Sequence, residues 1–229
     1  MKKNKIAIFD IDGTIFRSSL LIELVEALVV EGLFPENIRD TYIRAYKDWF
    51  NRRGSYEDYI SAVVVAFEKN IKGINNNAFI EIAKQVVADN KDRVYRYTRD
   101  LIKKLDKDNY YLLAISHSPK AIVQDFCRDW GFDKVYGRDY EVDENNEFTG
   151  ETLYLELISD KSKILKRVIE KENLVLTGSV GVGDSEGDIT LLQMVERPIC
   201  FNPNAKLYSQ AKLSGWEVVI ERKDVIYEI

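Results

Sequence analysis

The sequence predicts an α/β fold, in which a parallel sheet is covered by helices on both faces and a helical unit is inserted after the first strand. Three observations predict it. A short apolar run occupies residues 5–9, an almost wholly helical pattern runs from about residue 17 to 105, and strands alternate with helices after that. We therefore predict a core of residues 1–16 and 106–229 and a helical cap of residues 17–105.

The first predicted strand, KIAIF at 5–9, is apolar throughout and contains β-branched and aromatic residues, as a buried central strand does. In the helical block that follows, turns are indicated at GLFPEN, RRGSY and KGINNN. The run LLIELVEALVV at 20–30 contains Glu23 and Glu26 and is too short to cross a bilayer, so it predicts an amphipathic core helix.

After residue 105 the sequence alternates between the two-residue period of a strand and the 3.6-residue period of a helix. Each strand-like run is followed by a helix-like one, which is the pattern of a parallel sheet whose ligands bind at the carboxyl ends of its strands. The segment 139–153 predicts a hairpin that turns at Asn145–Asn146. Strands are predicted at 110–116, 179–184, 198–201 and 216–220, and helices at 118–131, 160–172 and 186–196.

Composition and charge indicate an ordinary globular protein. The apolar fraction is 45%, the charged fraction 31% and the formal net charge −5, with no basic stripe, so we expect no nucleic-acid partner. Cys127 and Cys200 lack metal-site spacing and indicate free thiols of a reducing compartment. The basic start resembles a signal peptide, but Asp10 and Asp12 interrupt its apolar stretch. We therefore predict a cytoplasmic protein without a membrane partner.

Polar residues follow three of the predicted strands. Asp10, Ser116 and Asp184 stand where these strands end, so a parallel sheet brings them to one edge. Neighbouring carboxylates repel each other, and a hard divalent cation such as Mg²⁺ offsets that repulsion. The alternative is that each aspartate only caps a helix or lies in a loop. An EF-hand is excluded, because the twelfth position counted from Asp10 is Leu21.

The helix predicted at 160–172 distinguishes two lysines. Lys161 shares the apolar face with Ile164 and Leu165, whereas Lys163 lies on the opposite, polar face. A lysine on a buried face needs negative charge nearby, so we predict that Lys161 holds a phosphate oxygen and offsets the carboxylates. Asp188, four residues after Asp184, is predicted to point toward the same site.

The segment SHSPK at 116–120 combines a strand end with a helix start. Ser118 predicts an N-cap, with Pro119 at the first helical position. Ser116 then faces a helix N-terminus, where an anion is favoured, although a turn serine without such a role remains the alternative. A Ser/His hydrolase using His117 is disfavoured, because adjacent residues of an extended segment point in opposite directions and no G-x-S-x-G motif is present.

Taken in order, DIDGT, AISHSP, Lys161 before ILKRV, and GVGDSEGD resemble the haloacid dehalogenase superfamily, in the branch that contains phosphoserine phosphatase. The resemblance implies a Rossmann-like three-layer core with a parallel sheet and an inserted helical cap of the C1 type. It also implies a Mg²⁺-dependent phosphomonoesterase that hydrolyses a small phosphorylated metabolite through an aspartyl-phosphate.

The resemblance implies a role for each matching residue. Asp10 matches the nucleophile, and Asp12 matches the general acid and base. The Mg²⁺ ligands would be the carboxylates of Asp10 and Asp184 and the backbone carbonyl of Asp12, with Asp188 supporting them. Gly13 would permit a turn beside the phosphate, and the hydroxyl of Thr14 would secure that loop. The implied phosphate-binding set is Gly13, Thr14, Ser116, His117 and Lys161.

The sequence departs from phosphoserine-specific relatives at the positions that read the substrate. Those relatives have a glutamate where this chain has Ser19, and their cap arginine aligns near Ser61. Arg52 and Arg53 lie close by in the sequence and are the candidates to replace that arginine, with a role as solvated loop residues as the favoured alternative for both. We therefore favour another small phosphomonoester over phosphoserine. The alternatives are a phosphoserine phosphatase proper, a phosphotransferase or mutase, and a non-catalytic phosphate-binding module. The sequence leaves the oligomeric state open.

Overall fold

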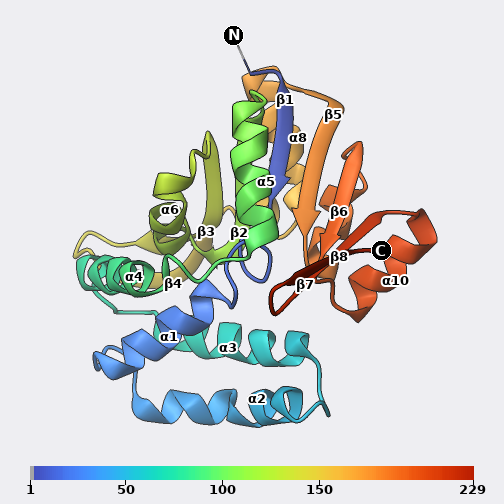
Figure 1. Cartoon of the computed structure of the whole chain (residues 1–229). Helices are drawn as coiled ribbons and strands as arrows, with labels where there is room; N and C mark the ends of the chain where they lie inside the picture. The colour runs from blue at the N-terminus through green and yellow to red at the C-terminus, as the bar shows by residue number, and fades with distance from the viewer. Residues whose placement is uncertain (1–2) are drawn as a thin grey trace.

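The computed structural model describes residues 3–229 and contains an eight-stranded sheet with helices on both faces (Figure 1). The strand order is β4-β3-β2-β1-β5-β6-β7-β8, so the first strand of the chain lies near the centre. The strands are β1 (Lys5–Phe9), β2 (Tyr111–Pro119), β3 (Lys134–Val142), β4 (Phe148–Leu153), β5 (Val175–Gly183), β6 (Arg197–Phe201), β7 (Glu217–Arg222) and β8 (Val225–Glu228).

The six strands β3, β2, β1, β5, β6 and β7 run parallel to one another, and β4 and β8 pair antiparallel at the two edges. The predicted α/β fold is confirmed. Each edge strand follows its neighbour through a short turn, which only antiparallel strands allow. The β3–β4 turn includes Asn146 at φ 61°, as the predicted hairpin requires. No strand was predicted for the segment that forms β8.

Helices α1 (Leu20–Val30), α2 (Ile43–Phe50) and α3 (Tyr56–Asn70) lie at the end of the sheet toward which β1 and β5 point (Figure 1). Helix α5 (Arg96–Lys107) instead lies against the sheet and contacts β2. The division at residues 16 and 105 therefore stays a prediction. The α-helices are α1 (Leu20–Val30), α2 (Ile43–Phe50), α3 (Tyr56–Asn70), α4 (Asn76–Asn90), α5 (Arg96–Lys107), α6 (Lys120–Cys127), α7 (Leu155–Ile158), α8 (Lys161–Glu172), α9 (Ile189–Leu192) and α10 (Ala205–Ser214).

Two predicted helices are shorter in the structure. The helix predicted at 118–131 begins only at Lys120, because the chain stays extended through Pro119, which pairs with Arg138 of β3. Pro119, and not Ser118, therefore occupies the N-cap position. The helix predicted at 186–196 is a 3₁₀ turn, Glu186–Asp188, followed by the short α9.

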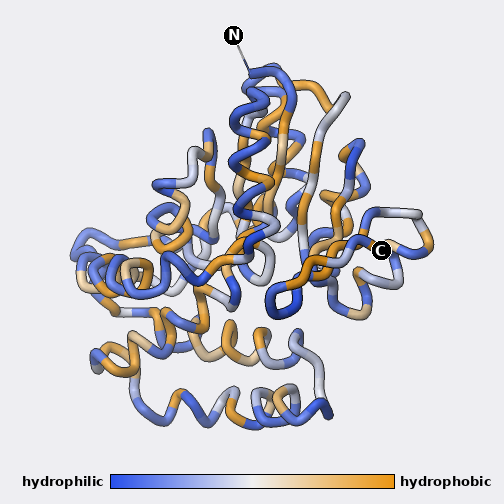
Figure 2. Tube along the Cα trace, viewed as in Figure 1, coloured by the Kyte–Doolittle hydropathy of each residue, from blue (hydrophilic) through white to orange (hydrophobic). Residues whose placement is uncertain are grey.

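The core lies on both faces of the sheet, and β1 shows how the sequence produces it. Ala7 and Phe9 belong to the large cluster shared with α1, α5 and α6, whereas Ile6 and Ile8 belong to the cluster with α8. Successive side chains of a strand point to opposite faces, so a strand covered on both sides needs an unbroken apolar run. Figure 2 shows hydrophobic colouring along the central strands and also on parts of α1 and α3.

Two further expectations concern the whole chain. Cys127 and Cys200 are both buried free thiols, as predicted. Among residues 3–229, no helix combines the length and the apolar character needed to cross a bilayer.

Candidate active site

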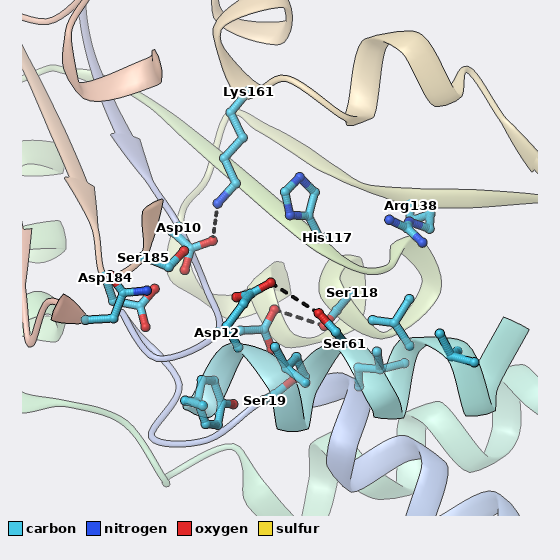
Figure 3. A pocket seen from close by; sticks show the side chains of 17 residues that line it. Asp10, Asp12, Ser19, Ser61, His117, Ser118, Arg138, Lys161, Asp184 and Ser185 are labelled. Atoms are coloured by element: carbon cyan, nitrogen blue, oxygen red, sulfur yellow. Dashed lines mark hydrogen bonds and ion pairs between the residues drawn. The ribbon is translucent and has the colours of Figure 1, made fainter. Parts of the chain in front are cut away.

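A cavity of about 430 Å³ lies between the carboxyl ends of the central strands and α3 (Figure 3). Most of the acidic residues singled out in the sequence line it, and α3 covers it from the side of the insertion. Its walls are formed by Asp10, Asp12, Ser19, Leu21, Tyr56, Glu57, Ile60, Ser61, Val64, Val65, His117, Ser118, Arg138, Lys161, Asp184, Ser185 and Asn204.

Lys161 is the buried cation of the site. Its Nζ lies 2.5 Å from Oδ1 of Asp10 and 2.5 Å from Oδ1 of Asp188, and its side chain is only 3% exposed. Burial by itself lowers the pKa of Lys161, but the charges of the two aspartates outweigh it and raise that pKa above its ordinary value. Lys163 is exposed. The helical period therefore separated the two lysines correctly.

Three carboxylates meet beside Lys161. One oxygen from each of Asp10, Asp184 and Asp188 lies within 4.8 Å of the others. Burial raises the pKa of Asp10 to about 7, against the opposing charge of Lys161. Burial and the charge of Asp10 likewise raise the pKa of Asp184 well above its ordinary value. One lysine therefore does not compensate the cluster fully, and a divalent cation with oxygen ligands fits this donor set.

The hydrogen bonds distinguish a ligand from a support within this cluster. Asp188 uses both oxygens: Oδ1 accepts from Lys161, and Oδ2 accepts from the backbone N–H groups of Asp184 and Ser185, each at 3.1 Å. Within residues 3–229, the carboxylate of Asp184 accepts no hydrogen bond, so its oxygens are available to a cation. Asp188 thus has the geometry of the supporting residue that the resemblance implies.

Gly13 lets the loop after β1 approach Asp184. Its φ is +78°, and a Cβ at this position would lie 2.1 Å from Oδ2 of Asp184. The hydroxyl of the neighbouring Thr14 has no hydrogen-bond partner within residues 3–229. The loop is held instead through the backbone carbonyl of Thr14, which accepts from Oγ1 of Thr98 at 2.9 Å. The expectation that the Thr14 hydroxyl secures the loop is not met.

The carboxylate of Asp12 is fixed by three donors. Its Oδ2 accepts from the hydroxyls of Ser116 at 2.6 Å and Ser118 at 2.9 Å, and its Oδ1 accepts from the backbone N–H of Leu20 at 2.5 Å. Ser116, predicted to hold phosphate, is fully buried and does not line the cavity. Ser118, predicted only as a helix cap, does line it. The two serines are alternate residues of an extended segment, so their side chains lie on the same side. This strand period would have identified Ser118 as a neighbour of Asp12.

His117 lines the cavity, and its Nε2 lies 3.0 Å from the carbonyl oxygen of Ile158. Desolvation at the cavity wall lowers the pKa of His117 to about 4, and the positive charge of Lys161 acts in the same direction. The imidazole is therefore neutral near pH 7 and offers a hydrogen bond but no charge to a ligand.

Three of the residues proposed to read the substrate lie in different surroundings. Ser19 is buried, lines the cavity and occupies the N-cap position of α1. Ser61 also lines the cavity and donates to Oε1 of Glu57 at 3.2 Å. Arg52 does not line it, because it is exposed in the turn between α2 and α3, at φ 59°.

Sequence reasoning missed Arg138, a cavity-lining arginine on β3. Arg138 lies just before the hairpin predicted at 139–153, in a stretch for which no element was predicted. The available signal was the position of this arginine in the strand that follows SHSP, since neighbouring parallel strands bring their carboxyl ends together.

Comparisons with known proteins identify the family of this chain and proteins that are similar to it. The family model of haloacid dehalogenase-like hydrolases matches residues 7–193. The inhibition of morphological differentiation protein of Streptomyces azureus is 24% identical, over 93% of this chain and 77% of its own length. The histidinol-phosphatase of Neisseria meningitidis serogroup C is 23% identical, over 93% of this chain and 97% of its own length. A structure described as a phospho-aspartyl intermediate analogue of phosphoserine phosphatase superposes with a TM-score of 0.63 at 20% identity. The superposition covers 97% of this chain and 96% of that structure.

Proposed function

Because the chain belongs to the haloacid dehalogenase-like hydrolase family, we propose that it is a Mg²⁺-dependent phosphomonoesterase that acts through an aspartyl-phosphate. The observation that carries this proposal is the carboxylate of Asp10. It lies at the end of β1 and lines the cavity, and Lys161 holds its Oδ1. Oδ2 accepts no hydrogen bond within residues 3–229, so it is free to attack phosphorus.

The first step transfers the phosphoryl group to Asp10. Oδ2 of Asp10 forms a bond to phosphorus while the bond from phosphorus to the leaving oxygen breaks, and Asp12 protonates that oxygen. In the second step Asp12 takes a proton from water, the water oxygen forms a bond to phosphorus, and the bond from phosphorus to Oδ2 of Asp10 breaks, which releases phosphate. The three donors on Asp12 keep its carboxylate in one orientation for both proton transfers.

Mg²⁺, when bound, neutralises charge on the carboxylates and the phosphate. The carboxylates of Asp10 and Asp184, with the backbone carbonyl of Asp12, would hold it, and Asp188 would orient Lys161. Lys161 would hold a phosphate oxygen, with His117 beside it at the cavity wall. Ser116 would act through Asp12, since Asp12 is the residue that it contacts.

We propose a small phosphorylated metabolite as the substrate. Ser19 offers no negative charge to an amino group, which argues against a phosphoserine phosphatase proper. The buried free thiols of Cys127 and Cys200 support the accompanying proposal of a cytoplasmic location. A phosphotransferase or mutase uses the same first step, and differs in passing the phosphoryl group to an alcohol.

A panel of phosphomonoesters, with and without Mg²⁺, tests the proposal. It includes p-nitrophenyl phosphate, phosphoserine and histidinol phosphate, and compares the wild type with Asp10→Asn and with the exposed-site control Asp40→Asn. We expect Mg²⁺-dependent phosphate release by the wild type and the control only.

Other results would contradict the proposal in distinguishable ways. Turnover by Asp10→Asn equal to that of the wild type would exclude the covalent route. Activity confined to phosphoserine would reverse the substrate preference. Phosphoryl transfer to an added alcohol without phosphate release would indicate a transferase, and ligand binding without turnover would indicate a binding module.

A further inference from the structure

Arg138 is held at the cavity by the close approach of two strands. Pro119 of β2 pairs with Arg138 of β3, and the preceding Gly137 lies so near that a Cβ there would be 2.6 Å from Cα of Lys120. A larger residue at 137 would push β3 away. In the view of Figure 3, Arg138 lies on the opposite side of His117 from Lys161.

The guanidinium of Arg138 has an unused edge. Its side chain is 17% exposed, and Nη1 pairs with Glu68 of α3. Nε is buried and has no hydrogen-bond partner within residues 3–229. Nη1 lies on the side of the group nearer Cδ and pairs with Glu68, and the Tyr140 hydroxyl also lies within hydrogen-bonding range of the guanidinium. The edge formed by Nε and Nη2 therefore retains the Nε donor without a partner in the described part of the chain. That edge carries two parallel N–H donors, the arrangement that binds a carboxylate in bidentate fashion.

The wall between the acidic cluster and Arg138 is mostly apolar, and its one acid, Glu57, accepts a hydrogen bond from Ser61. α3 contributes Ile60, Ser61, Val64 and Val65 to it. At 1.5 Å per residue, the stretch of α3 from Tyr56 to Val64 measures about 12 Å. This is room for a phosphoryl group and a short carbon chain.

Tyr56 marks the phosphate end of that wall. Burial raises the pKa of Tyr56, and the charges of Asp12 and Asp184 act in the same direction because they are close. At the other end, Arg138 adds to the effect of Lys161 on the pKa of His117. The cavity thus has one cation at each end, with His117 within range of both.

We propose that Arg138 binds a carboxylate at the far end of the leaving group, so that the preferred substrate is a phosphomonoester of a small hydroxy acid. This inference rests on the proposed phosphatase activity and specifies its substrate class. An amino group in the same place would meet the positive charge of Arg138 and be disfavoured, and a purely apolar tail would leave Nε without a partner.

The test uses esters of one chain length. We compare kcat/KM for 4-phosphooxybutanoate, butyl phosphate and 4-aminobutyl phosphate in the presence of Mg²⁺. The wild type should prefer the carboxylate ester over the butyl ester at least tenfold, with the amino ester poorest. Arg138→Met should reduce that preference at least tenfold. Arg138→Lys should retain part of it, because lysine supplies the positive charge but not the two parallel N–H donors of the guanidinium. Arg44→Met, at a side chain that is 95% exposed, is the matched control.

A competing role for Arg138 is to hold α3 against the sheet through Glu68. Glu68→Gln breaks that ion pair and keeps the arginine, so under our proposal it preserves the preference for the carboxylate ester. If Glu68→Gln and Arg138→Met lose the preference equally, or if Arg138→Met slows all esters by one factor, the proposal is wrong.

A binding measurement separates this inference from the proposed function. Calorimetry with 5-phosphonopentanoate and pentylphosphonate needs no turnover. The wild type should bind the carboxylate compound at least tenfold more tightly, and Arg138→Met should remove that difference. Absence of any turnover would overturn the proposed function alone, whereas equal affinities in the wild type would overturn the role of Arg138.

Discussion

The carboxylate of Asp12 accepts a hydrogen bond of 2.5 Å from the backbone N–H of Leu20, the first residue of α1. Ser19 occupies the N-cap position of that helix but makes no side-chain cap. Asp12 therefore supplies the capping acceptor from the loop after β1. The residue proposed to move protons also fixes the start of the helical insertion over the cavity.

This dual role predicts that two substitutions of Asp12 differ in stability but not in activity. Asp12→Asn keeps an oxygen that can accept from Leu20, whereas Asp12→Ala should lower the free energy of unfolding by about 1 kcal/mol relative to it. Both should lower kcat at least about 100-fold, because neither transfers a proton. Urea unfolding and steady-state kinetics provide the measurements. Equal stability of the two variants would show that the contact with Leu20 carries no weight.

Two lysines of α8 provide a second test. Lys161→Gln leaves Asp10 and Asp188 buried without their cation, so the free energy of unfolding at pH 7 should fall by about 3–5 kcal/mol. Lys163 lies two residues further along the same helix, on its exposed side. Lys163→Gln should therefore change the free energy of unfolding by less than about 0.5 kcal/mol. Chemical denaturation compares them directly. A similar small change in both would contradict the ion-pair geometry.

Gly13 and Gly32 form a third matched pair, because both have positive φ. At Gly32 nothing lies within 4 Å of an added Cβ. Gly32→Ala should therefore lower the free energy of unfolding only by the cost of a positive φ at a residue with a Cβ, about 1 kcal/mol. At Gly13 the Cβ would displace the carboxylate of Asp184. Gly13→Ala should therefore weaken Mg²⁺ binding at least about tenfold, and Gly32→Ala should not. Calorimetric titration with Mg²⁺ distinguishes the two.

The raised pKa of Asp10 predicts how Mg²⁺ binding depends on pH. Between its unfolded value of 3.8 and its folded value of about 7, the folded protein holds a proton that the unfolded chain releases. The contribution of Asp10 to stability is thus present at low pH and lost as the pH rises through 7. Mg²⁺ requires deprotonated carboxylates, so protonation of Asp10 alone should lower its affinity about 30-fold from pH 8 to pH 5.5, and the raised pKa of Asp184 lowers it further.

Isothermal titration calorimetry measures this effect in two ways. The dissociation constant should rise as the pH falls, and below pH 7 binding should release protons, detected with buffers of different ionisation enthalpy. Asp10→Asn should bind Mg²⁺ weakly at both pH values. An affinity in the wild type that stays constant from pH 5.5 to 8 would show that the pKa of Asp10 is not raised.

The strand pattern was sufficient to predict where the acids gather. Asp10 and Asp184 end parallel strands, and the carboxyl ends of such strands meet at one edge for any chain of this topology. The period of α8 likewise assigned Lys161 to the buried face. These features depend on repeats within a single element, which the sequence displays directly.

Contacts between segments distant in the chain were decided only by the tertiary structure. Ser116 and Ser118 donate to Asp12 because the chain stays extended through Pro119. Arg138 reaches the cavity because the register of β2 and β3 brings the chain close to Gly137. Register is set by packing on both faces of the sheet, and no local pattern contains it. The sequence by itself therefore determined the fold class and the family-like acidic site. The tertiary structure decided which groups are already engaged and which remain free to meet a ligand.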